Sequence, residues 1–353
     1  MHVEDRPPAR RVTIEHVSRA AGVSRSTVSR VVNGVESRIP IGVDTRERVL
    51  RVVRELGYRP DPLARGLRGG GTALLGLLVR EVTDPFFAWA IQEIASEAGR
   101  RGYRVVLGPT HSGQTATRVL SAILETRHCE AIILLGEALS GEPGIVSELR
   151  QSRLPLVALC TPPPWPGVVT IRTDNQRGAQ LALEHLYELG HRRIALLGRG
   201  LDDFGQRVQA YRAFVASKEL RLPDGYEQPA RDLSVSQIAT GDLSMRTLLA
   251  LPEPPTAVFA ITDQIALGAL SVMAGVGLRA PKDLSIVGFD DIPLAAHAAP
   301  PLSTVRQPID RMARHVVDVT ISLIQHKEQA DSPGAVMDPE LVVRASTGPP
   351  SFP

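Results

Sequence analysis

The chain has 353 residues, of which 43% are hydrophobic and 22% are charged, enough apolar material for two or three folded domains. It holds only two cysteines, Cys129 and Cys160, which excludes a disulfide framework and leads us to expect a reducing, cytoplasmic location. No apolar run is long enough to span a bilayer, and the first ten residues lack the apolar segment of a secretory signal.

The charge is divided unevenly along the chain. The formal net charge is only +2, but residues 1–68 hold 14 Arg and no Lys against 8 acidic residues, which gives +6. The rest of the chain therefore carries −4. A basic head on a mildly acidic body is typical of a nucleic-acid-binding domain joined to a regulatory part.

Residues 1–11 are expected to form a disordered tail, and residues 12–60 a small helical head. Within the head, apolar spacing predicts three helices over 14–21, 24–32 and 44–56, with no strand pattern. The third helix has an apolar stripe, and Gly57 is a stop signal. The stripe consists of Val49, Val52, Val53 and Leu56.

From residue 74 onward, short apolar runs alternate with segments of helix length. This alternation predicts α/β architecture with parallel sheets. The expected strands are "ALLGLLV", "YRVVLG", "AIILL", "LPLVAL", "VVTI", "RRIALLG", "TAVFAI" and "LSIVGF".

The first two predicted helices have the pattern of a helix-turn-helix motif. Gly22 permits a tight turn between them, and Ser18 and Ala21 are small enough for the helices to approach closely. The second helix carries arginine and hydroxyl side chains but no acid, so we expect it to enter the major groove of DNA. The alternative is an ordinary three-helix bundle with a solvated polar face.

Three residues of the second helix are candidates for reading bases. Arg25 can donate two hydrogen bonds to guanine, Ser26 can contact almost any base, and Arg30 lies about one turn further along. Short polar side chains nearby are suited to phosphate oxygens. These are Thr13 and Ser24, each also expected to cap a helix, and Thr27, Ser29 and Asn33.

Long motifs follow one another in collinear order over residues 12–348. They include "VTIEHVSRAAGVSRSTVSRVVNG", "TRERVLRVVRELGYRPDPLARGLRGG", "TDNQRGA", "ELGHRRIALLG", "LSIVGFDDIP" and "PLSTVRQP". Together they closely resemble the lactose/galactose-repressor family of bacterial transcription regulators. The resemblance implies a helix-turn-helix head, a hinge helix over 61–71, a two-lobed core over 72–348 like the periplasmic sugar-binding proteins, and a loose tail over 349–353.

The resemblance also implies a homodimer that binds a pseudo-palindromic operator and acts as a repressor. Arg25, Ser26 and Arg30 fall at the family's base-reading positions. Leu67 matches a leucine that the family inserts into the minor groove, and Ala64 packs beside it. The alternative for Leu67 is a residue that covers the linker.

A small-molecule effector, with no cofactor or metal, is expected between the two lobes at the carboxyl ends of the strands. Thr83, Asp84 and Phe87 follow the first strand and are expected to face this cleft. Arg207 and Asp290 match family positions that hold effectors, and the pair can grip adjacent hydroxyls. For both residues, a structural cap or an ion pair between the lobes is the alternative.

Three pocket positions depart from the family's sugar-binding pattern. Cys160 replaces a frequent Asp, Leu233 a frequent aromatic residue, and Thr262 a frequent Asn. These changes predict a pocket more apolar than a typical hexose site. We expect a sugar or sugar derivative, with a nucleobase-type corepressor as the alternative.

Further expectations concern single residues of the core. Asp263 is expected to cap the helix that it opens, with contact to the effector as the alternative. Asp174 and Asn175 are expected to cap the helix after the "VVTI" strand and to hold the region between the lobes. Trp89 and Ile94 are candidates for dimer contacts, with burial in the core as the alternative.

Two other classes of protein fit the sequence less well. A periplasmic solute-binding protein would share the core but would need an export signal and no basic head. An enzyme is not expected, because the chain has no Gly-rich phosphate loop, no metal-ligand cluster and no defensible nucleophile triad.

Overall fold

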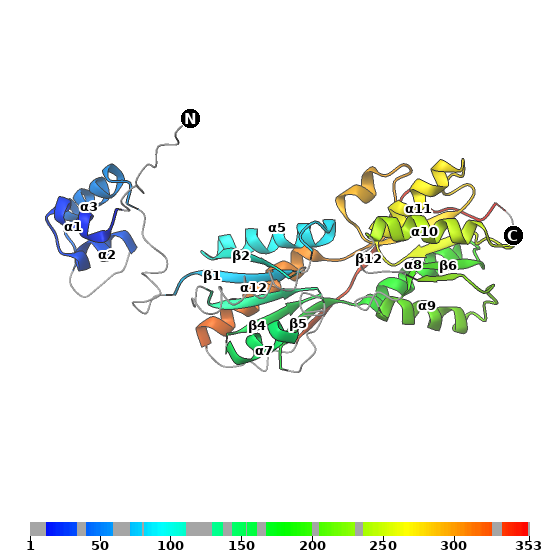
Figure 1. Ribbon diagram of the computed structural model, residues 1–353, viewed down its shortest axis with the longest axis horizontal. Helices are drawn as coiled ribbons and strands as arrows, with labels where there is room; N and C mark the ends of the chain where they lie inside the picture. The colour runs from blue at the N-terminus through cyan, green and yellow to red at the C-terminus, as the bar shows by residue number, and fades with distance from the viewer. Residues whose placement is uncertain are drawn as a thin grey trace, which may run out of the picture. The chain divides into compact units, whose positions relative to one another are not determined.

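The computed structural model describes residues 12–33, 40–58, 71–79, 81–110, 129–136, 143–152, 154–160, 167–199, 205–229, 236–326 and 334–351. The chain divides into two compact units, Met1–Ala73 and Leu74–Pro353 (Figure 1). The first unit is referred to below as the head and the second as the core. The expected hinge helix, with Ala64 and Leu67, lies outside the described residues.

The described part of the head consists of three helices, as the sequence predicts. They are α1 (Ile14–Ala21), α2 (Arg25–Asn33) and α3 (Val43–Glu55). Gly22 has a φ of +64°, which lets the chain turn sharply between α1 and α2. The helices bury one apolar cluster, made of Val17, Ala21, Val28, Val31, Val49 and Val52.

The predicted apolar stripe of the third helix is wrong at its last residue. The helix ends at Glu55, and Leu56 lies in the turn that follows, where its side chain is exposed. Gly57, with a φ of +63°, continues that turn. The Leu56 N–H still donates to the Val52 carbonyl oxygen, but the chain turns at the next residue, and no partner covers the Leu56 side chain in the described part of the head.

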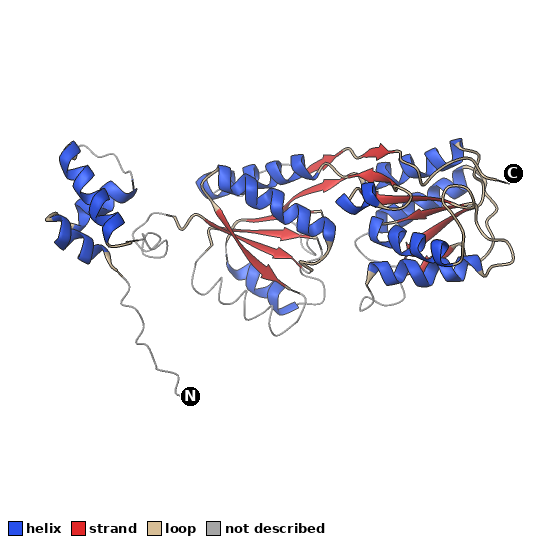
Figure 2. Cartoon of the chain, turned by 90° about the horizontal axis from the view of Figure 1, so that it is seen from above, coloured by secondary structure: helices blue, strands red, loops and turns tan. Residues whose placement is uncertain are grey.

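The core contains two six-stranded sheets, each flanked by helices (Figure 2). All strand pairs of the first sheet are parallel. Its strands, in spatial order, are β11 (Ala335–Met337), β5 (Val169–Thr173), β4 (Leu156–Leu159), β3 (Ala131–Leu135), β1 (Leu74–Val79) and β2 (Arg104–Pro109). The described helices beside it are α5 (Pro85–Arg100), α7 (Pro143–Ser152) and α12 (Ile309–His326), and together with the sheet they are referred to below as the first lobe.

The second sheet is parallel except where β12 pairs with β10. Its strands are β12 (Glu340–Val342), β10 (Ser303–Arg306), β9 (Ser285–Asp290), β8 (Ala257–Ala260), β6 (Ile194–Arg199) and β7 (Glu227–Pro229). The helices of this second lobe are α8 (Asn175–Glu188), α9 (Gly205–Ser217), α10 (Gln237–Leu249) and α11 (Asp263–Gly275), followed by a short 3-10 helix, Pro293–His297.

The chain passes between the lobes three times. It leaves the first lobe after β5 to enter α8, returns from β10 to α12, and passes from β11 to β12 near the end. Residues from distant parts of the sequence therefore meet where the lobes join. The expectation of a two-lobed α/β core with parallel sheets is confirmed.

Within the described residues, all eight predicted strands are present, and four further strands were missed. The missed strands are β7, β10, β11 and β12. Three of them, β7, β11 and β12, have only three residues each, too short for an apolar run to stand out in the sequence, and β10 begins with the polar residues Ser303 and Thr304.

Candidate functional site

Hydroxyl groups gather at the first turn of α2. The Ser24 Oγ accepts the backbone N–H of Thr27 at 3.1 Å, so Ser24 caps this helix as predicted. The same oxygen hydrogen-bonds to Ser26 Oγ at 2.7 Å and to Thr27 Oγ1 at 2.8 Å. A helix N-terminus presents N–H groups and partial positive charge, so this hydroxyl-rich turn is suited to phosphate oxygens.

Arg25 projects from the same turn, and its side chain is 68% exposed. Its Nη1 donates to Glu15 Oε2 of α1 at 3.3 Å. The helix α2 itself has no acid, but the fold places Glu15 of α1 against Arg25. Sequence reasoning missed this contact because the two residues lie on different helices, ten positions apart.

The other predicted DNA contacts differ in exposure. Ser26 is exposed, whereas Thr27, Ser29 and Arg30 are half-buried. Thr13 is exposed at the N-cap of α1, where its backbone N–H donates to His16 Nδ1 at 3.1 Å. The backbone of Asn33 belongs to α2, and its side chain lies outside the described parts.

In the core, Asp84 is a contact point between the lobes. Its carboxylate caps α5 by accepting the backbone N–H groups of Phe86 at 2.9 Å and Phe87 at 3.3 Å. From the second lobe, Gln237 Nε2 donates to it at 3.0 Å and Gln264 Nε2 at 2.9 Å. Burial of this carboxyl raises its pKa above the usual range.

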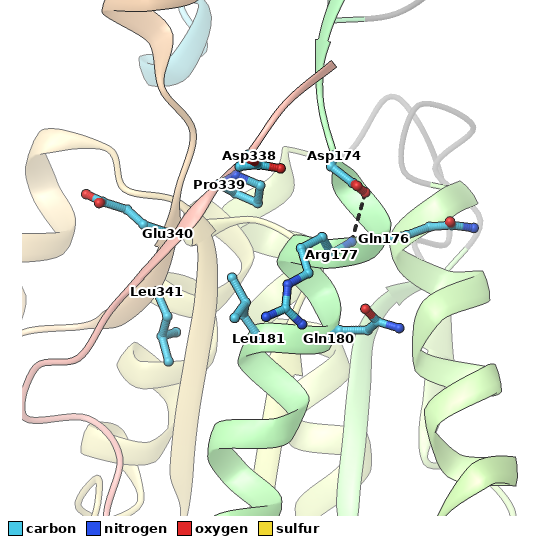
Figure 3. A pocket seen from close by; sticks show the side chains of 9 residues that line it. All are labelled: Asp174, Gln176, Arg177, Gln180, Leu181, Asp338, Pro339, Glu340 and Leu341. Carbon is cyan, nitrogen blue, oxygen red and sulfur yellow. Dashed lines mark hydrogen bonds between the residues drawn. The ribbon is translucent and has the colours of Figure 1, made fainter.

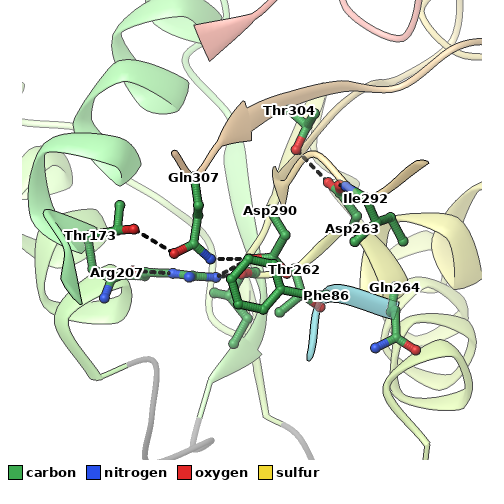
Figure 4. Close-up of polar contacts among 12 residues, drawn as sticks. Phe86, Thr173, Arg207, Thr262, Asp263, Gln264, Asp290, Ile292, Thr304 and Gln307 are labelled. Carbon is green, nitrogen blue, oxygen red and sulfur yellow. Dashed lines mark hydrogen bonds and ion pairs between the residues drawn. The ribbon is translucent and has the colours of Figure 1, made fainter. Parts of the chain in front are cut away.

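Arg207 and Asp290 form a second polar cluster on the second lobe (Figure 4). Arg207 Nη1 lies 3.4 Å from Asp290 Oδ1 and also donates to the Ile261 carbonyl oxygen. Its Nε donates to Asn175 Oδ1 at 2.8 Å, and its guanidinium stacks on the Phe289 ring with Cζ 3.4 Å from the centroid. Both charged side chains are almost fully buried.

Gln307 extends this cluster to the first lobe. Its Nε2 donates to Asp290 Oδ1 at 2.8 Å, and its Oε1 accepts the Thr173 hydroxyl at 2.7 Å. Thr173 ends β5 and Gln307 follows β10, so each residue lies beside one of the passages between the lobes. Burial raises the pKa of Asp290 to about 7, while the nearby Arg207 guanidinium acts in the opposite direction.

Thr262, rather than Asp263, caps α11, so the predicted cap is corrected by one residue. The Thr262 hydroxyl donates to Gln237 Oε1 at 2.6 Å, and its oxygen accepts the Ile265 N–H at 3.4 Å. Asp263 is the first helical residue and is fully buried, where it accepts the Ile292 N–H at 2.9 Å and the Thr304 hydroxyl. Asp263 therefore connects the start of α11 to β10 and to the segment that follows β9, all within the second lobe.

The remaining predicted effector residues differ in exposure and in whether the structure describes them. Thr83 is exposed, and its hydroxyl donates to Glu81 Oε1 at 3.1 Å. Phe87 is half-buried beside Phe86, with ring centroids 5.7 Å apart. Cys160 is half-buried with a φ of +77°. Leu233 lies outside the described residues.

The structure thus brings two pairs of predicted residues into one interlobe region, Asp84 with Thr262 through Gln237, and Arg207 with Asp290. Asn175, which the sequence placed in the interlobe region, accepts from Arg207. Sequence reasoning missed the contacts of three glutamines, because amide side chains carry no distinctive spacing. These are Gln237, Gln264 and Gln307.

A cavity of about 690 Å³ lies elsewhere, beside α8 and the segment 338–341 (Figure 3). None of the predicted effector residues lines it. Asp174, at its edge, accepts the backbone N–H of Arg177 at 2.9 Å and caps α8 as predicted.

Two negative observations hold for the described parts of the chain. Within them, no helix is long and apolar enough to cross a membrane. No group of three or more His, Cys, Asp or Glu side chains could hold a metal ion there. Of the two candidates for dimer contacts, Ile94 is fully buried in the first lobe, so the alternative of core burial holds for it, while Trp89 is half-buried.

Two protein families match the chain. Residues 13–61 match the bacterial regulatory proteins of the lacI family, and residues 183–347 match a periplasmic binding protein-like domain. The first match covers the described head, and the second covers most of the second lobe and the return into the first.

Curated relatives match nearly the whole chain. The HTH-type transcriptional repressor CytR of Escherichia coli K12 is 33% identical over 95% of this chain and 96% of its own. The HTH-type transcriptional regulator CelR of Thermobifida fusca is 34% identical over 96% of this chain and 98% of its own.

Solved structures agree with these relatives. A transcriptional regulator CelR–cellobiose complex is 31% identical, with a TM-score of 0.70 over 95% of this chain and all of that chain. The lac repressor dimer bound to operator and the anti-inducer ONPF is 26% identical, with a TM-score of 0.79 over 96% of this chain and all of that chain.

Proposed function

The chain belongs to the lacI family of bacterial regulatory proteins, and from this premise we propose that it is a transcription repressor controlled by a small effector. It binds a pseudo-palindromic operator as a homodimer, one head to each half-site. The solved lac repressor dimer on its operator supports this arrangement.

The exposed first turn of α2 is the observation that carries the DNA-binding part of the proposal. Arg25 and Ser26 face solvent at the positive end of this helix, where a base edge can meet them. Arg30 reads a base one turn further along. Thr13, Ser24, Thr27, Ser29 and Asn33 serve phosphate contacts. The assignment of Ala64 and Leu67 to the minor groove rests on the family resemblance alone.

Selection of duplexes from a random-sequence pool by the purified full-length chain tests this part. We expect a palindromic consensus with a guanine in each half-site. Arg25→Ala should lose discrimination at that guanine by about 1–3 kcal/mol and leave the other positions in place. Equal weakening on every sequence would instead assign Arg25 to phosphate.

The effector is a sugar or sugar derivative held between the lobes. Asp84, Arg207, Thr262 and Asp290 supply donors and acceptors that now satisfy one another or the neighbouring amides, and a polyhydroxylated ligand can replace those bonds. The cellobiose complex of a relative supports a sugar. Thr83, Phe87, Cys160 and Leu233 complete the proposed lining of the pocket.

A thermal-shift screen of the full-length chain against sugars, sugar phosphates and nucleobases tests the effector site. A ligand that binds only the folded state, at a hundredfold excess over its Kd, stabilises by about 2.7 kcal/mol. Arg207→Ala should abolish the shift. Arg212→Ala is the matched control, because Arg212 lies on the same helix but is exposed and pairs with Glu227.

Each outcome of the screen has a distinct meaning. A sugar that stabilises Arg212→Ala but not Arg207→Ala would support the proposed site. A nucleobase that behaves in this way would make the protein corepressor-dependent. A ligand that still stabilises Arg207→Ala as strongly as the wild type would place the effector site elsewhere in the core.

A further inference from the structure

Glu15 is the carboxylate that the fold brings to the proposed base-reading arginine. It lies in the first turn of α1, its side chain is 54% exposed, and its Oε2 accepts from Arg25 Nη1 at 3.3 Å. Both partners face solvent, so this contact does not contribute to the apolar cluster of the head. We therefore ask what the position of Glu15 against Arg25 does for DNA binding.

The contact leaves Arg25 equipped to read a base. A guanidinium has five N–H donors, and a guanine edge needs two of them for O6 and N7. Arg25 can therefore keep its bond to Glu15 through Nη1 while its other donors reach guanine. A carboxylate behind the guanidinium restricts its rotation and lowers the entropy lost when it binds.

The Glu15 carboxylate also disfavours a contact between Arg25 and a DNA phosphate, which competes with the contact to guanine. An arginine near DNA can turn to a phosphate, which carries no sequence information. If Arg25 leaves Glu15 for a phosphate, it gives up the ion pair and leaves the carboxylate close to the anionic backbone. Binding to guanine requires neither loss.

We propose that Glu15 is a specificity-determining residue of the operator-binding surface, which positions Arg25 on guanine and disfavours its use as a phosphate contact. This inference rests on the proposed DNA-binding function. An exposed ion pair is worth up to about fivefold in an equilibrium constant. A bidentate contact between arginine and guanine changes the equilibrium constant for binding by about five- to 150-fold. Glu15 can therefore increase the preference of Arg25 for guanine, but it cannot replace Arg25 as the residue that contacts the base.

The test compares two affinities for each variant of the full-length chain. The first probe is a duplex selected from a random pool by the wild-type protein, and the second has the Arg25-dependent guanine in each half-site replaced by adenine. The readout is the ratio of the two dissociation constants. General electrostatics and the fraction of active protein affect both constants equally and cancel from this ratio.

We expect Glu15→Gln to lower the ratio by about two- to fivefold. Glu55→Gln is the matched control, because it removes the same charge from an exposed position in α3 and should leave the ratio unchanged. In an Arg25→Ala background the ratio should be low and insensitive to Glu15→Gln, since Glu15 acts through Arg25.

The inference is overturned if Glu15→Gln leaves the ratio at the wild-type value, if Glu55→Gln lowers it equally, or if the effect of Glu15→Gln persists without Arg25. These results would leave the proposed function intact, because the wild-type protein would still have selected a sequence. Failure of the wild-type protein to select any sequence would overturn the proposed function itself.

Discussion

Asp290 shows how a single residue can serve both structure and ligand binding. It ends β9 with a φ of +114°, a backbone conformation that side-chain-bearing residues rarely adopt, and it is held by Arg207 and Gln307. The sequence left two roles open for it, an effector ligand or a structural cap or ion pair between the lobes. Asp290 does pair with Arg207, but both residues belong to the second lobe, so the pair does not join the lobes. The same carboxylate remains the proposed effector acceptor, so an effector must compete with existing partners.

The raised pKa of Asp290 predicts a pH-dependent stability. Burial raises the pKa of this carboxyl to about 7 in the folded core, whereas the same carboxyl in an unfolded chain has a pKa near 4. The unfolding free energy should therefore fall as pH rises from about 4 to about 7, because the folded state binds more protons over this interval. Asp263, whose pKa burial also raises, acts in the same direction.

Chemical denaturation of the wild type and of Asp290→Asn at several pH values measures this effect. The variant loses the partner of Arg207 and should be less stable overall, but its unfolding free energy should fall less steeply between pH 4 and pH 7. Arg207, Asp84 and Asp263 are the charged groups that face Asp290, and they remain in both proteins. The same slope in both proteins would show that Asp290 ionises normally. Asp310→Asn, an exposed change, is the control.

At the scale of elements, α10 and α11 pack unusually closely. Gly241 of α10 faces the Ile265 carbonyl, and Gly268 of α11 faces the Ile238 carbonyl. In each case a Cβ would collide with backbone of the other helix, which cannot move aside as a side chain can. The two glycines therefore set the spacing of this helix pair.

Gly241→Ala should destabilise the core by about 1–3 kcal/mol or more, because overpacking outweighs the gain in helix propensity. Gly99→Ala is the matched control, since Gly99 lies in α5, where an added methyl group would meet no other part of the protein within 4 Å. It should be neutral or stabilising by up to about 1 kcal/mol. Equal effects of the two changes in denaturant unfolding would contradict the account of this packing.

The sequence predicted elements well where burial was continuous. Eight strands could be found because each forms an apolar run between segments of helix length. The strand β10 was missed although it is buried, because it contains Ser303 and Thr304, whose hydroxyl groups hydrogen-bond to Thr347 and Asp263. Hydrogen bonds to residues far along the chain produce no periodic pattern in the local sequence, so they cannot be predicted from it.

The candidate sites also differ in how far the sequence could predict them. The residues of the DNA-binding turn are contiguous, so spacing and charge could indicate them. The contacts of Gln237, Gln264 and Gln307 depend on how two lobes meet, which no local pattern encodes. Glu15 was missed for the same reason, since only the packing of α1 on α2 brings it to Arg25.

For the whole molecule, the uneven charge of the chain links composition to function. Residues 1–68 carry +6 while the remainder carries −4, so attraction to a polyanion is concentrated at the head. Each phosphate that the head neutralises releases counterions from DNA. Control by the effector adds a coupling free energy between core and operator of about 1–3 kcal/mol in typical cases.

The most direct test is a titration of the full-length chain with the selected operator duplex and with a scrambled duplex of the same length, at several salt concentrations. We predict that the operator binds at least about 10³-fold more tightly than the scrambled duplex, and that both affinities fall linearly with salt on logarithmic axes. Equal affinity for the two duplexes, or affinities that do not change with salt, would contradict the assignment of this protein as a sequence-specific DNA-binding repressor.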